Sequence, residues 1–576
     1  MKKLMLGNMA IARGAYEAGA SVVSSYPGTP STEITENIAK YDEIYSEWAT
    51  NEKVATEVAV GASIVGARSM TCMKHVGLNV AADPLFTASY TGVGGGMVLV
   101  VADDPGMHSS QNEQDSRNYA KAAKLPMLEP ADSSDCKEFV KLAYDISEKY
   151  DTPVIVRLTT RVAHSQSLVA EEERVEKPLG TYEKNIGKNV MMPAMARGRH
   201  VYVEKRMVEL AEFADNSDIN AIEYNDKKIG IIASGIAYQY AKEAMPEASF
   251  LKIGMVHPLP MGKIKEFAKN VDKLYVVEEL DPFIEEACKV NGVDVIGKEI
   301  FTLLGEYTPE LIKAGITGEK YEEKQPSGIP VRPPVMCPGC PHRGVFHVLK
   351  KLGCTVSGDI GCYTLGAAAP LASIDVCVCM GASVSGLHGM TKARGEEFSK
   401  KSVAVIGDST FMHSGITGLI DIVYNKGNAT VIILDNSITG MTGHQQNPTT
   451  GYTIKGEPTR SVDLELLVKA VGVNRVTVAD PFEVDEFEKV VKAELEAAEP
   501  SVIIARRPCA LLKNVNYGAP CAVDADKCKG CKMCMKIGCP AITFKDGKAI
   551  IDPSQCNGCG LCTKICKFGA IGKQEA

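Results

Sequence analysis

Eight cysteines at short, regular intervals near the C-terminus constrain the fold of this 576-residue chain more than any other feature. They form two runs, Cys528-x2-Cys531-x2-Cys534-x4-Cys539-Pro and Cys556-x2-Cys559-x2-Cys562-x3-Cys566. Such density in a small secreted chain would indicate disulfides, but this chain is large and residues 1–14 lack the apolar core of a signal peptide. We therefore expect a cytoplasmic protein whose thiolates bind metal.

The spacing resembles that of bacterial two-cluster ferredoxins, in which three cysteines of a run hold one 4Fe–4S cubane and the fourth ligates the other. On that rule the two ligand sets are Cys528, Cys531, Cys534 and Cys566 (cluster one), and Cys556, Cys559, Cys562 and Cys539 (cluster two). A zinc ribbon is the alternative, although zinc needs only four ligands. Two departures from the pattern are the x4 spacing and Lys567, where proline usually follows. Cys521 is expected to be a buried or free thiol, with a substitute ligand as the alternative.

The charge and the hydropathy pattern exclude two classes of partner. A net charge of -8 and a pI near 5.8 argue against nucleic acid, which selects a basic face. No apolar stretch reaches the roughly 18 to 20 residues that a membrane span needs.

Short apolar runs alternate with segments of helical spacing, which predicts parallel sheets covered by helices on both faces. The predicted strands are 97–102, 154–158, 229–232, 274–277, 403–406 and 431–434. Charged or proline-rich seams at 318–334 and 507–520, with a weaker one in 170–227, divide the chain. We predict four domains: 1–180, 181–325, 326–515 and 516–576.

Polar residues follow two successive predicted strands of the third domain. Gly407-Asp408-Ser409 follows one, and Asp435-Asn436-Ser437-Ile438 begins 27 residues after Asp408. A carboxylate and an amide on adjacent strands, with a backbone carbonyl, form an oxygen site for Mg²⁺ that leaves room for a diphosphate. We expect a helix opening near Ser414–Gly415 to point its amides at the phosphates. Ordinary strand-end turns are the alternative.

This spacing resembles the GDG…NN motif of thiamine diphosphate enzymes, with Ser409 and Asp435 as mild departures. The resemblance implies that Asp408, Asn436 and the carbonyl of Ile438 hold Mg²⁺, with Gly407 beside them. The following loop, 440–445, resembles the TGxQ loop of the 2-oxoacid:ferredoxin oxidoreductases, which adds Thr442 to the cofactor site.

Thiamine needs a glutamate beside its pyrimidine N1′, usually just before a helix rich in alanine and glycine. Aligning Gly61-Ala62-Ser63 with the family pattern assigns this role to Glu52. Glu57, one turn further, stays the alternative, and both are solvated helix carboxylates if the assignment is wrong. The turn Tyr26–Ser31 resembles the YPITPS turn of the same enzymes, which places Thr29 at the substrate. A helix N-cap at Ser31 is compatible with that role.

Further polar residues follow predicted strands, where α/β proteins usually place their sites. Lys74 and His75 follow one strand, and the segment 104–117 ends at Arg117. A 2-oxo acid carries a carboxylate, which Lys74 or Arg117 would bind. Ordinary surface positions are the alternative for each.

Four scattered cysteines resemble the ligands of a proximal cubane that takes electrons from thiamine in related oxidoreductases: Cys337, Cys340, Cys362 and Cys509. A zinc clip or buried thiols are the alternatives. Cys377 and Cys379 have the spacing of alternate strand residues and are expected in the core.

Six segments together look like the α subunit of indolepyruvate:ferredoxin oxidoreductases: 51–55, 73–79, 103–117, 337–343, 358–366 and 379–383. The resemblance covers nearly the whole chain. It implies a multidomain α/β thiamine diphosphate-binding fold with a pyrimidine and substrate domain (1–180), a transketolase C-terminal-like domain (181–325), a diphosphate domain (326–515) and a two-cluster ferredoxin domain (516–576). The first and third are doubly wound parallel sheets.

The family's reaction is oxidative decarboxylation of arylpyruvates with coenzyme A, which yields arylacetyl-CoA, CO2 and reduced ferredoxin. The implied cofactors are thiamine diphosphate, Mg²⁺ and two 4Fe–4S clusters. Whether the four scattered cysteines hold a third cluster is left open. The implied partners are external ferredoxin and a β subunit with a γ-type domain, in an α2β2 assembly. The alternatives are a different 2-oxo acid substrate, a non-oxidative thiamine decarboxylase with structural clusters, and a non-catalytic electron-transfer subunit.

Overall fold

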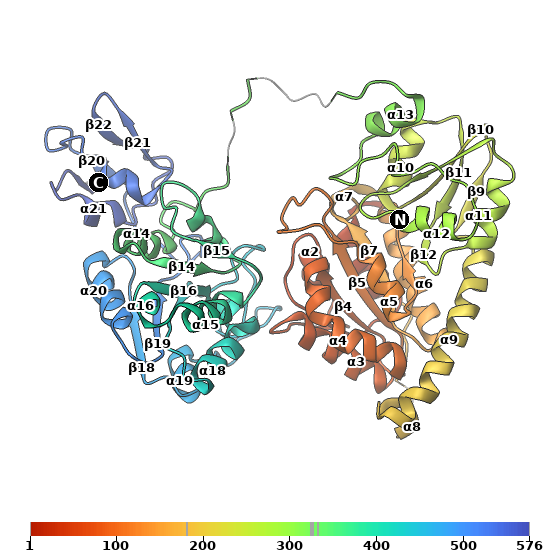
Figure 1. Ribbon diagram of the computed structural model, residues 1–576, viewed down its shortest axis with the longest axis horizontal. Coiled ribbons are helices and arrows are strands. Elements are labelled where there is room, and N and C mark those ends of the chain that lie inside the picture. Colours follow the sequence, from red (N-terminus) through yellow and green to blue (C-terminus); the bar gives the residue numbers. More distant parts are fainter. Residues whose placement is uncertain (1, 180–181, 323–327, 331–332, 575–576) are drawn as a thin grey trace. The chain divides into compact units, whose positions relative to one another are not determined.

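The chain forms two compact units, Met1–Pro326 and Ser327–Ala576, in this computed structural model (Figure 1). The structure describes residues 2–179, 182–322, 328–330 and 333–574. The division falls inside the charged, proline-rich segment 318–334, while the finer division into four domains stays a prediction. Among the described residues, no helix is long and apolar enough to cross a membrane.

The first unit is built on a seven-stranded sheet in the order β12-β6-β7-β5-β4-β2-β3. The strands are β2 (Val22–Ser25), β3 (Tyr45–Trp48), β4 (Ser69–Lys74), β5 (Met97–Asp103), β6 (Met127–Leu128), β7 (Val154–Thr159) and β12 (Met255–His257). All of its pairings are parallel except β12 with β6. The strands β3, β2, β4, β5 and β7 therefore end at the same edge.

Helices cover both faces of this sheet because its strands are apolar on both sides. On β5, Val98 and Val100 join one core and Leu99 and Val101 another. The first core is covered by α1 (Gly7–Glu17), α2 (Thr32–Ile38) and α6 (Ser133–Tyr150), and the second by α4 (His75–Thr91) and α5 (Arg117–Ala123).

A second, four-stranded sheet in this unit has the order β13-β10-β11-β9. It comprises β9 (Ala221–Glu223), β10 (Asp226–Ser234), β11 (Ala248–Ile253) and β13 (Lys273–Val277), with α10 (Gly235–Ala244), α11 (Met261–Ala268), α12 (Phe283–Val290) and α13 (Pro309–Thr317). The long helix α9 (Pro193–Asn216) contacts α4 and α11 (Figure 1). Strand β12 leaves this part of the chain to pair with β6, so the first two predicted domains share a sheet.

The second unit contains a six-stranded parallel sheet in the order β15-β14-β16-β17-β19-β18. The strands are β14 (Thr355–Gly358), β15 (Val376–Cys377), β16 (Ser402–Gly407), β17 (Thr430–Asp435), β18 (Arg475–Ala479) and β19 (Ser501–Arg506). One face packs on α14 (His342–Leu352) and α20 (Val484–Leu495), the other on α15 (Ala382–Arg394), α18 (Ile416–Tyr424) and α19 (Leu464–Ala470).

The C-terminal segment of this unit adds two small antiparallel pairs, β20 (Cys521–Val523) with β23 (Ile571–Lys573) and β21 (Ile542–Lys545) with β22 (Lys548–Ile551). Its short helices are η3 (Met533–Ile537) and α21 (Leu561–Ile565). Ile537, Ile542 and Leu561 share one hydrophobic core with Phe346 of α14. The cysteine-rich segment is therefore packed onto the helix that follows Cys340.

The predicted α/β class and all six predicted strands are confirmed, but two local expectations are wrong. The helix after β16 begins at Asp408, not near Ser414, because α17 (Asp408–Thr410) continues through the π-turn η2 (Phe411–Gly415) into α18. Cys377 and Cys379 are exposed rather than in the core, because β15 is a two-residue edge strand.

Candidate functional site

Glu52 lies where the chain leaves β3 and enters α3 (Glu52–Ile64) of the first unit. The preceding Asn51 caps the helix, because its side chain accepts a hydrogen bond from Val54 N at 2.9 Å. The Glu52 side chain is buried, 5% exposed, against Gly77 of α4. A Cβ at position 77 would stand 2.7 Å from Glu52 Oε1, so only glycine leaves room for this carboxylate.

Glu57, the alternative activating carboxylate, lies on the outer face of the same helix. Its side chain is 46% exposed and forms an ion pair with Lys53. The structure thus separates the two candidates, since one carboxylate is enclosed at the sheet edge and the other is at the surface.

Thr29, in the turn after β2, and Lys74, at the end of the neighbouring strand β4, meet around Ser109. Lys74 Nζ donates to Ser109 O at 2.5 Å, and Ser109 Oγ donates to Thr29 O at 3.4 Å. A Cβ at Gly28 would stand 3.1 Å from Lys74 Cβ, so the turn and the lysine are in close contact. The parallel register therefore assembles residues from distant parts of the sequence at one edge of the sheet.

Lys74 and His75 are buried polar side chains at this edge. Burial lowers the pKa of Lys74 to about 8, although Asp104 favours its charged form. Burial also lowers the pKa of His75, whose Nε2 lies 3.3 Å from Asn112 O. Below about pH 8 the Lys74 ammonium is charged and can donate charge-assisted hydrogen bonds to a small anion.

Arg117, the other candidate for binding the substrate carboxylate, serves a different purpose. Its guanidinium is 1% exposed, with ion pairs to Asp115 at 2.6 Å and to Glu278 at 2.5 Å. The same group also donates to the carbonyls of Glu279 and Asp281. These contacts tie the segment after β5 to the segment after β13, and they leave the guanidinium committed to internal partners.

The motif carboxylates of the second unit lie together at the carboxyl edge of β16 and β17. Asp408 is 2% exposed, and burial followed by repulsion from Asp435 raises its pKa to about 7. Ser409 N donates to its Oδ1 at 2.8 Å, and Thr449 Oγ1 to its Oδ2 at 3.3 Å. Two buried carboxylates that repel each other fit a site for a divalent cation.

Asn436 and Ile438 continue this cluster after β17. Asn436 Oδ1 accepts from Ile438 N at 3.4 Å, and the intervening Ser437 has a positive φ of 60°. Asp435 accepts from Arg506 Nε at 2.8 Å, which holds that carboxylate at the strand end. The donor set of carboxylate, amide and carbonyl oxygens fits Mg²⁺.

A loop that was not predicted from the sequence lies against Asp408. Thr449 bonds Asp408 directly, and Asn447 Nδ2 donates to Thr439 Oγ1 at 3.3 Å. Thr442 lies in the preceding turn, with its Oγ1 2.5 Å from Gln445 Oε1. The polar run Asn447-Pro-Thr-Thr450 was the available signal, because such runs form turns that present side-chain oxygens.

The four cysteines of the predicted proximal cluster converge beside this cation site. Burial raises the pKa of the Cys362 thiol to about 11, and the neighbouring thiols of Cys509 and Cys337 add to the shift. Cys362 and Cys337 have the same effect on Cys340. Cys509 N donates to the Asn436 carbonyl at 2.9 Å, so this set of thiols adjoins the residue that follows β17.

The cysteines of the C-terminal runs form two groups that follow the predicted pairing. Cys531, Cys566 and Cys528 each raise the pKa of Cys534, after burial. In the second group the thiols of Cys539 and Cys556 help to raise the pKa of Cys559. The thiols of Cys559 and Cys539 help to raise the pKa of Cys562. Cys566, the last cysteine of the second run, therefore lies near the first run, and Cys539, the last cysteine of the first run, lies near the second.

Cys521 is a fifth thiol in the second group. It is 1% exposed on β20, its N–H donates to Cys556 Sγ at 3.3 Å, and a hydrogen bond joins its side chain to Cys562. All five thiols line one small cavity together with Gly339 and Arg343.

Within the described residues, no three His, Cys, Asp or Glu side chains are arranged to hold one metal ion. A 4Fe–4S cubane differs from such a site, because each of its four irons takes a single cysteine. The thiols that line one small cavity in the second group fit that larger cofactor.

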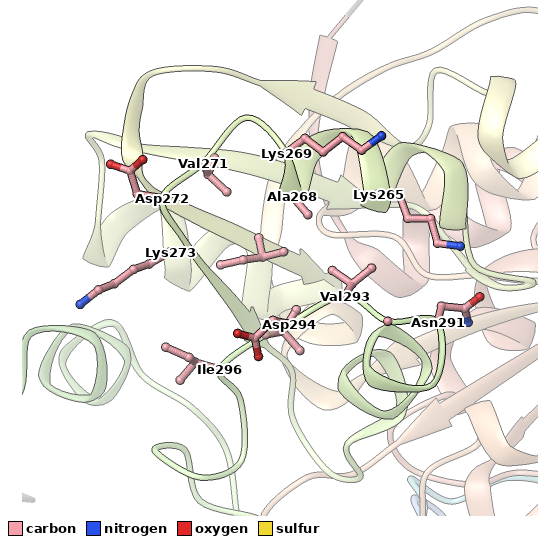
Figure 2. Close-up of a pocket in the computed structure, with 13 residues that line it drawn as sticks. Lys265, Ala268, Lys269, Val271, Asp272, Lys273, Asn291, Val293, Asp294 and Ile296 are labelled. Carbon is pink, nitrogen blue, oxygen red and sulfur yellow. The ribbon is translucent and has the colours of Figure 1, made fainter.

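A pocket of the first unit lies elsewhere, on the four-stranded sheet (Figure 2). Its volume is about 550 Å³, with Lys265, Lys269, Lys273, Asp272 and Asp294 in its lining. The ammonium groups of Lys269 and Lys273 point in different directions in Figure 2. None of the predicted site residues lines this pocket.

Models of three known families match the chain. They are the thiamine diphosphate-binding domain of pyruvate flavodoxin/ferredoxin oxidoreductases (residues 13–229), the C-terminal domain of thiamine pyrophosphate enzymes (359–505) and a 4Fe–4S binding domain (548–571). Together with the parallel sheets and the grouped cysteines, they define a thiamine diphosphate-dependent oxidoreductase with a 4Fe–4S-binding part.

Whole-chain relatives identify the family. The indolepyruvate oxidoreductase subunit IorA of Archaeoglobus fulgidus is 41% identical, over 99% of this chain and 97% of its own. That of Pyrococcus horikoshii is 40% identical over the same shares. The chain belongs to the family of the indolepyruvate oxidoreductase subunit IorA. A solved 2-oxoglutarate:ferredoxin oxidoreductase from Magnetococcus marinus is 19% identical, with a TM-score of 0.47 over 55% of this chain and 65% of its own.

Proposed function

We propose that this chain is the catalytic subunit of an enzyme that oxidatively decarboxylates arylpyruvates, indolepyruvate among them, with coenzyme A. The products are an arylacetyl-CoA, CO2 and reduced ferredoxin. Support comes from the family membership and from the residues at the two sheet edges. We further propose a partner β subunit with a γ-type domain, an α2β2 assembly and an external ferredoxin as the final acceptor.

Each candidate residue, taken within its own unit, has a defined task in this proposal. Thiamine diphosphate, when bound, supplies a nucleophilic carbon and an electron sink for decarboxylation. Asp408, Asn436 and the Ile438 carbonyl hold Mg²⁺ at the diphosphate, with Gly407, Ser409, Asp435 and Thr442 around it. Glu52 exchanges a proton with the pyrimidine, while Lys74 binds the substrate carboxylate with Thr29 and His75 beside it.

The observation that carries the proposal is the grouping of Cys337, Cys340, Cys362 and Cys509 directly beside the diphosphate motif. Decarboxylation leaves two electrons that ferredoxin accepts one at a time. A 4Fe–4S cluster next to the cofactor supplies such a one-electron acceptor, whereas a non-oxidative decarboxylase has no use for it. The two C-terminal clusters would then lead onward to ferredoxin.

The test is an anaerobic assay of the chain with its partner subunit, indolepyruvate, coenzyme A and ferredoxin or a viologen. We expect acceptor reduction that depends on coenzyme A and releases CO2. Aldehyde formation without acceptor reduction would instead establish the non-oxidative reaction. Phenylpyruvate, hydroxyphenylpyruvate and 2-oxoglutarate, assayed in parallel, identify the substrate class.

Replacing Lys74 by Met tests the binding of the substrate carboxylate. Loss of a charge-assisted hydrogen bond is expected to raise KM for the 2-oxo acid about 10- to 100-fold, with a smaller change in kcat. The Lys74 ammonium, whose pKa is about 8, is charged below that pH and neutral above it. In the unchanged protein kcat/KM should therefore fall as the pH rises through about 8, and this fall should be absent in the variant.

Lys53→Met is the matched control, because Lys53 is an exposed lysine that pairs with Glu57. An unaltered KM in a folded Lys74→Met protein would remove Lys74 from the binding site.

A further inference from the structure

Arg343 lies between two of the three cysteine groups of the second unit. Arg343 is in the first turn of α14, shortly after Cys340, and is 2% exposed. It lies close enough to Cys337 and Cys340 on one side, and to Cys539 and Cys559 on the other, to interact with their thiols electrostatically. It also lines the cavity of the second cysteine group.

The guanidinium of Arg343 joins the two segments that carry these cysteines. Its Nε donates to Cys337 O at 3.1 Å, and its Nη2 donates to Met336 O, so one side of the fork holds the Cys337–Cys340 loop. Its Nη1 donates to Ile537 O at 2.9 Å and to Gly538 O at 2.5 Å, directly before Cys539. One buried side chain therefore ties together the two segments that carry these cysteines.

The turn at Gly538, within the first cysteine run, lies directly against Arg343. Gly538 follows η3 with a positive φ of 64°. A Cβ there would stand 2.9 Å from Pro370 Cδ and 3.3 Å from Arg343 Nη1. A glycine turn within the x4 segment thus has its carbonyl in reach of Arg343.

A second observation concerns the charge of Arg343. Among the described residues its hydrogen bonds go to backbone carbonyls, and the acidic groups that favour its charged form are the thiols of cysteines. A buried cation without a carboxylate partner is costly. Cysteine-ligated cubanes carry net negative charge, so one on each side of the guanidinium would offset this cost.

We propose that Arg343 is the positioning residue between the proximal cluster (Cys337, Cys340, Cys362, Cys509) and cluster two (Cys539, Cys556, Cys559, Cys562). It holds the two clusters at a fixed separation and stabilises an added electron on either of them. One electron passes from the reduced proximal cluster to oxidised cluster two, and external ferredoxin finally accepts it. The proposal rests on the function proposed above.

Two variants separate the charge of Arg343 from its hydrogen-bonding fork. Arg343→Met removes both, whereas Arg343→Lys keeps the charge and loses the fork. Lys351→Met is the control, because it removes a positive charge from the same helix at a side chain that is 53% exposed and pairs with Glu488.

The first measurement is an anaerobic redox titration of the purified protein, followed by electron paramagnetic resonance, without substrate. With Arg343→Met, we expect lower midpoint potentials for the proximal cluster and cluster two and an unchanged potential for cluster one, because charge and hydrogen bonds near a cluster set its potential. Arg343→Lys should retain most of both potentials. Unchanged potentials in an iron-replete Arg343→Met protein would overturn the proposal.

The second measurement is amide hydrogen exchange over residues 533–542. It tests the positioning role even if the Arg343→Met protein does not retain iron, because it uses Arg343→Lys. Loss of the fork in Arg343→Lys should raise exchange there more than about tenfold, and Lys351→Met should leave it unchanged. Equal exchange in Arg343→Lys and the unchanged protein would overturn the positioning role. Neither measurement uses substrate turnover, so failure of the proposed reaction is recognised separately.

Discussion

Replacing Glu52 by Gln is expected to lower turnover of the 2-oxo acid by about 10²- to 10⁴-fold, the usual contribution of a positioned proton-transfer group. Glutamine keeps the shape of the side chain and its fit against Gly77, but it cannot exchange a proton with the pyrimidine. Thiamine diphosphate should therefore remain bound. Turnover and cofactor content, measured on the same anaerobic sample, separate lost catalysis from lost binding.

Glu57→Gln is the matched control for this substitution, because it makes the same chemical change one turn along the same helix at an exposed side chain. It should leave turnover within about twofold, as surface substitutions usually do. Undiminished turnover in Glu52→Gln, or a large loss in Glu57→Gln, would reverse the assignment of the activating carboxylate.

Replacing Cys362 by Ala should abolish acceptor reduction while leaving thiamine diphosphate bound. Cys362 lies at the start of η1 (Cys362–Ala367), where Asp359 anchors the preceding turn by accepting from Gly381 N and Ser383 N, each at 2.9 Å. Loss of one ligand from a four-cysteine set removes or degrades the cluster, and electrons then have no acceptor beside the cofactor. Iron content and acceptor reduction, measured together, test this expectation.

Cys354→Ala is the control, because Cys354 is a half-buried thiol of the same unit outside the three groups. It should keep the iron content and the rate of acceptor reduction. Acceptor reduction that persists in a Cys362→Ala protein of normal thiamine content would leave these four cysteines without a role in electron transfer.

Much of the site could be predicted because its residues follow strands of a parallel sheet. In the first unit Lys74 ends β4 and Glu52 follows the short turn after β3, at one edge of a parallel sheet; in the second unit Asp408 directly follows β16 of a different parallel sheet. The sequence could not show which polar side chains are already paired with residues far away in the chain. Arg117 has the residue type and place of an anion ligand, but Glu278, 161 residues away, occupies its guanidinium.

The cysteine runs, the thiamine motifs and the alternation of strands and helices are local patterns, so the sequence alone determined the class of fold and the thiamine and 4Fe–4S cofactor classes, while the pairing of the cysteines stays a prediction. Tertiary structure decided which polar side chains are left for substrate, because that depends on partners distant in sequence. It also decided what the turn at Gly538 contacts. Gly538 acquires its meaning only beside Arg343, 195 residues earlier in the chain, where packing brings two cysteine groups to one buried cation.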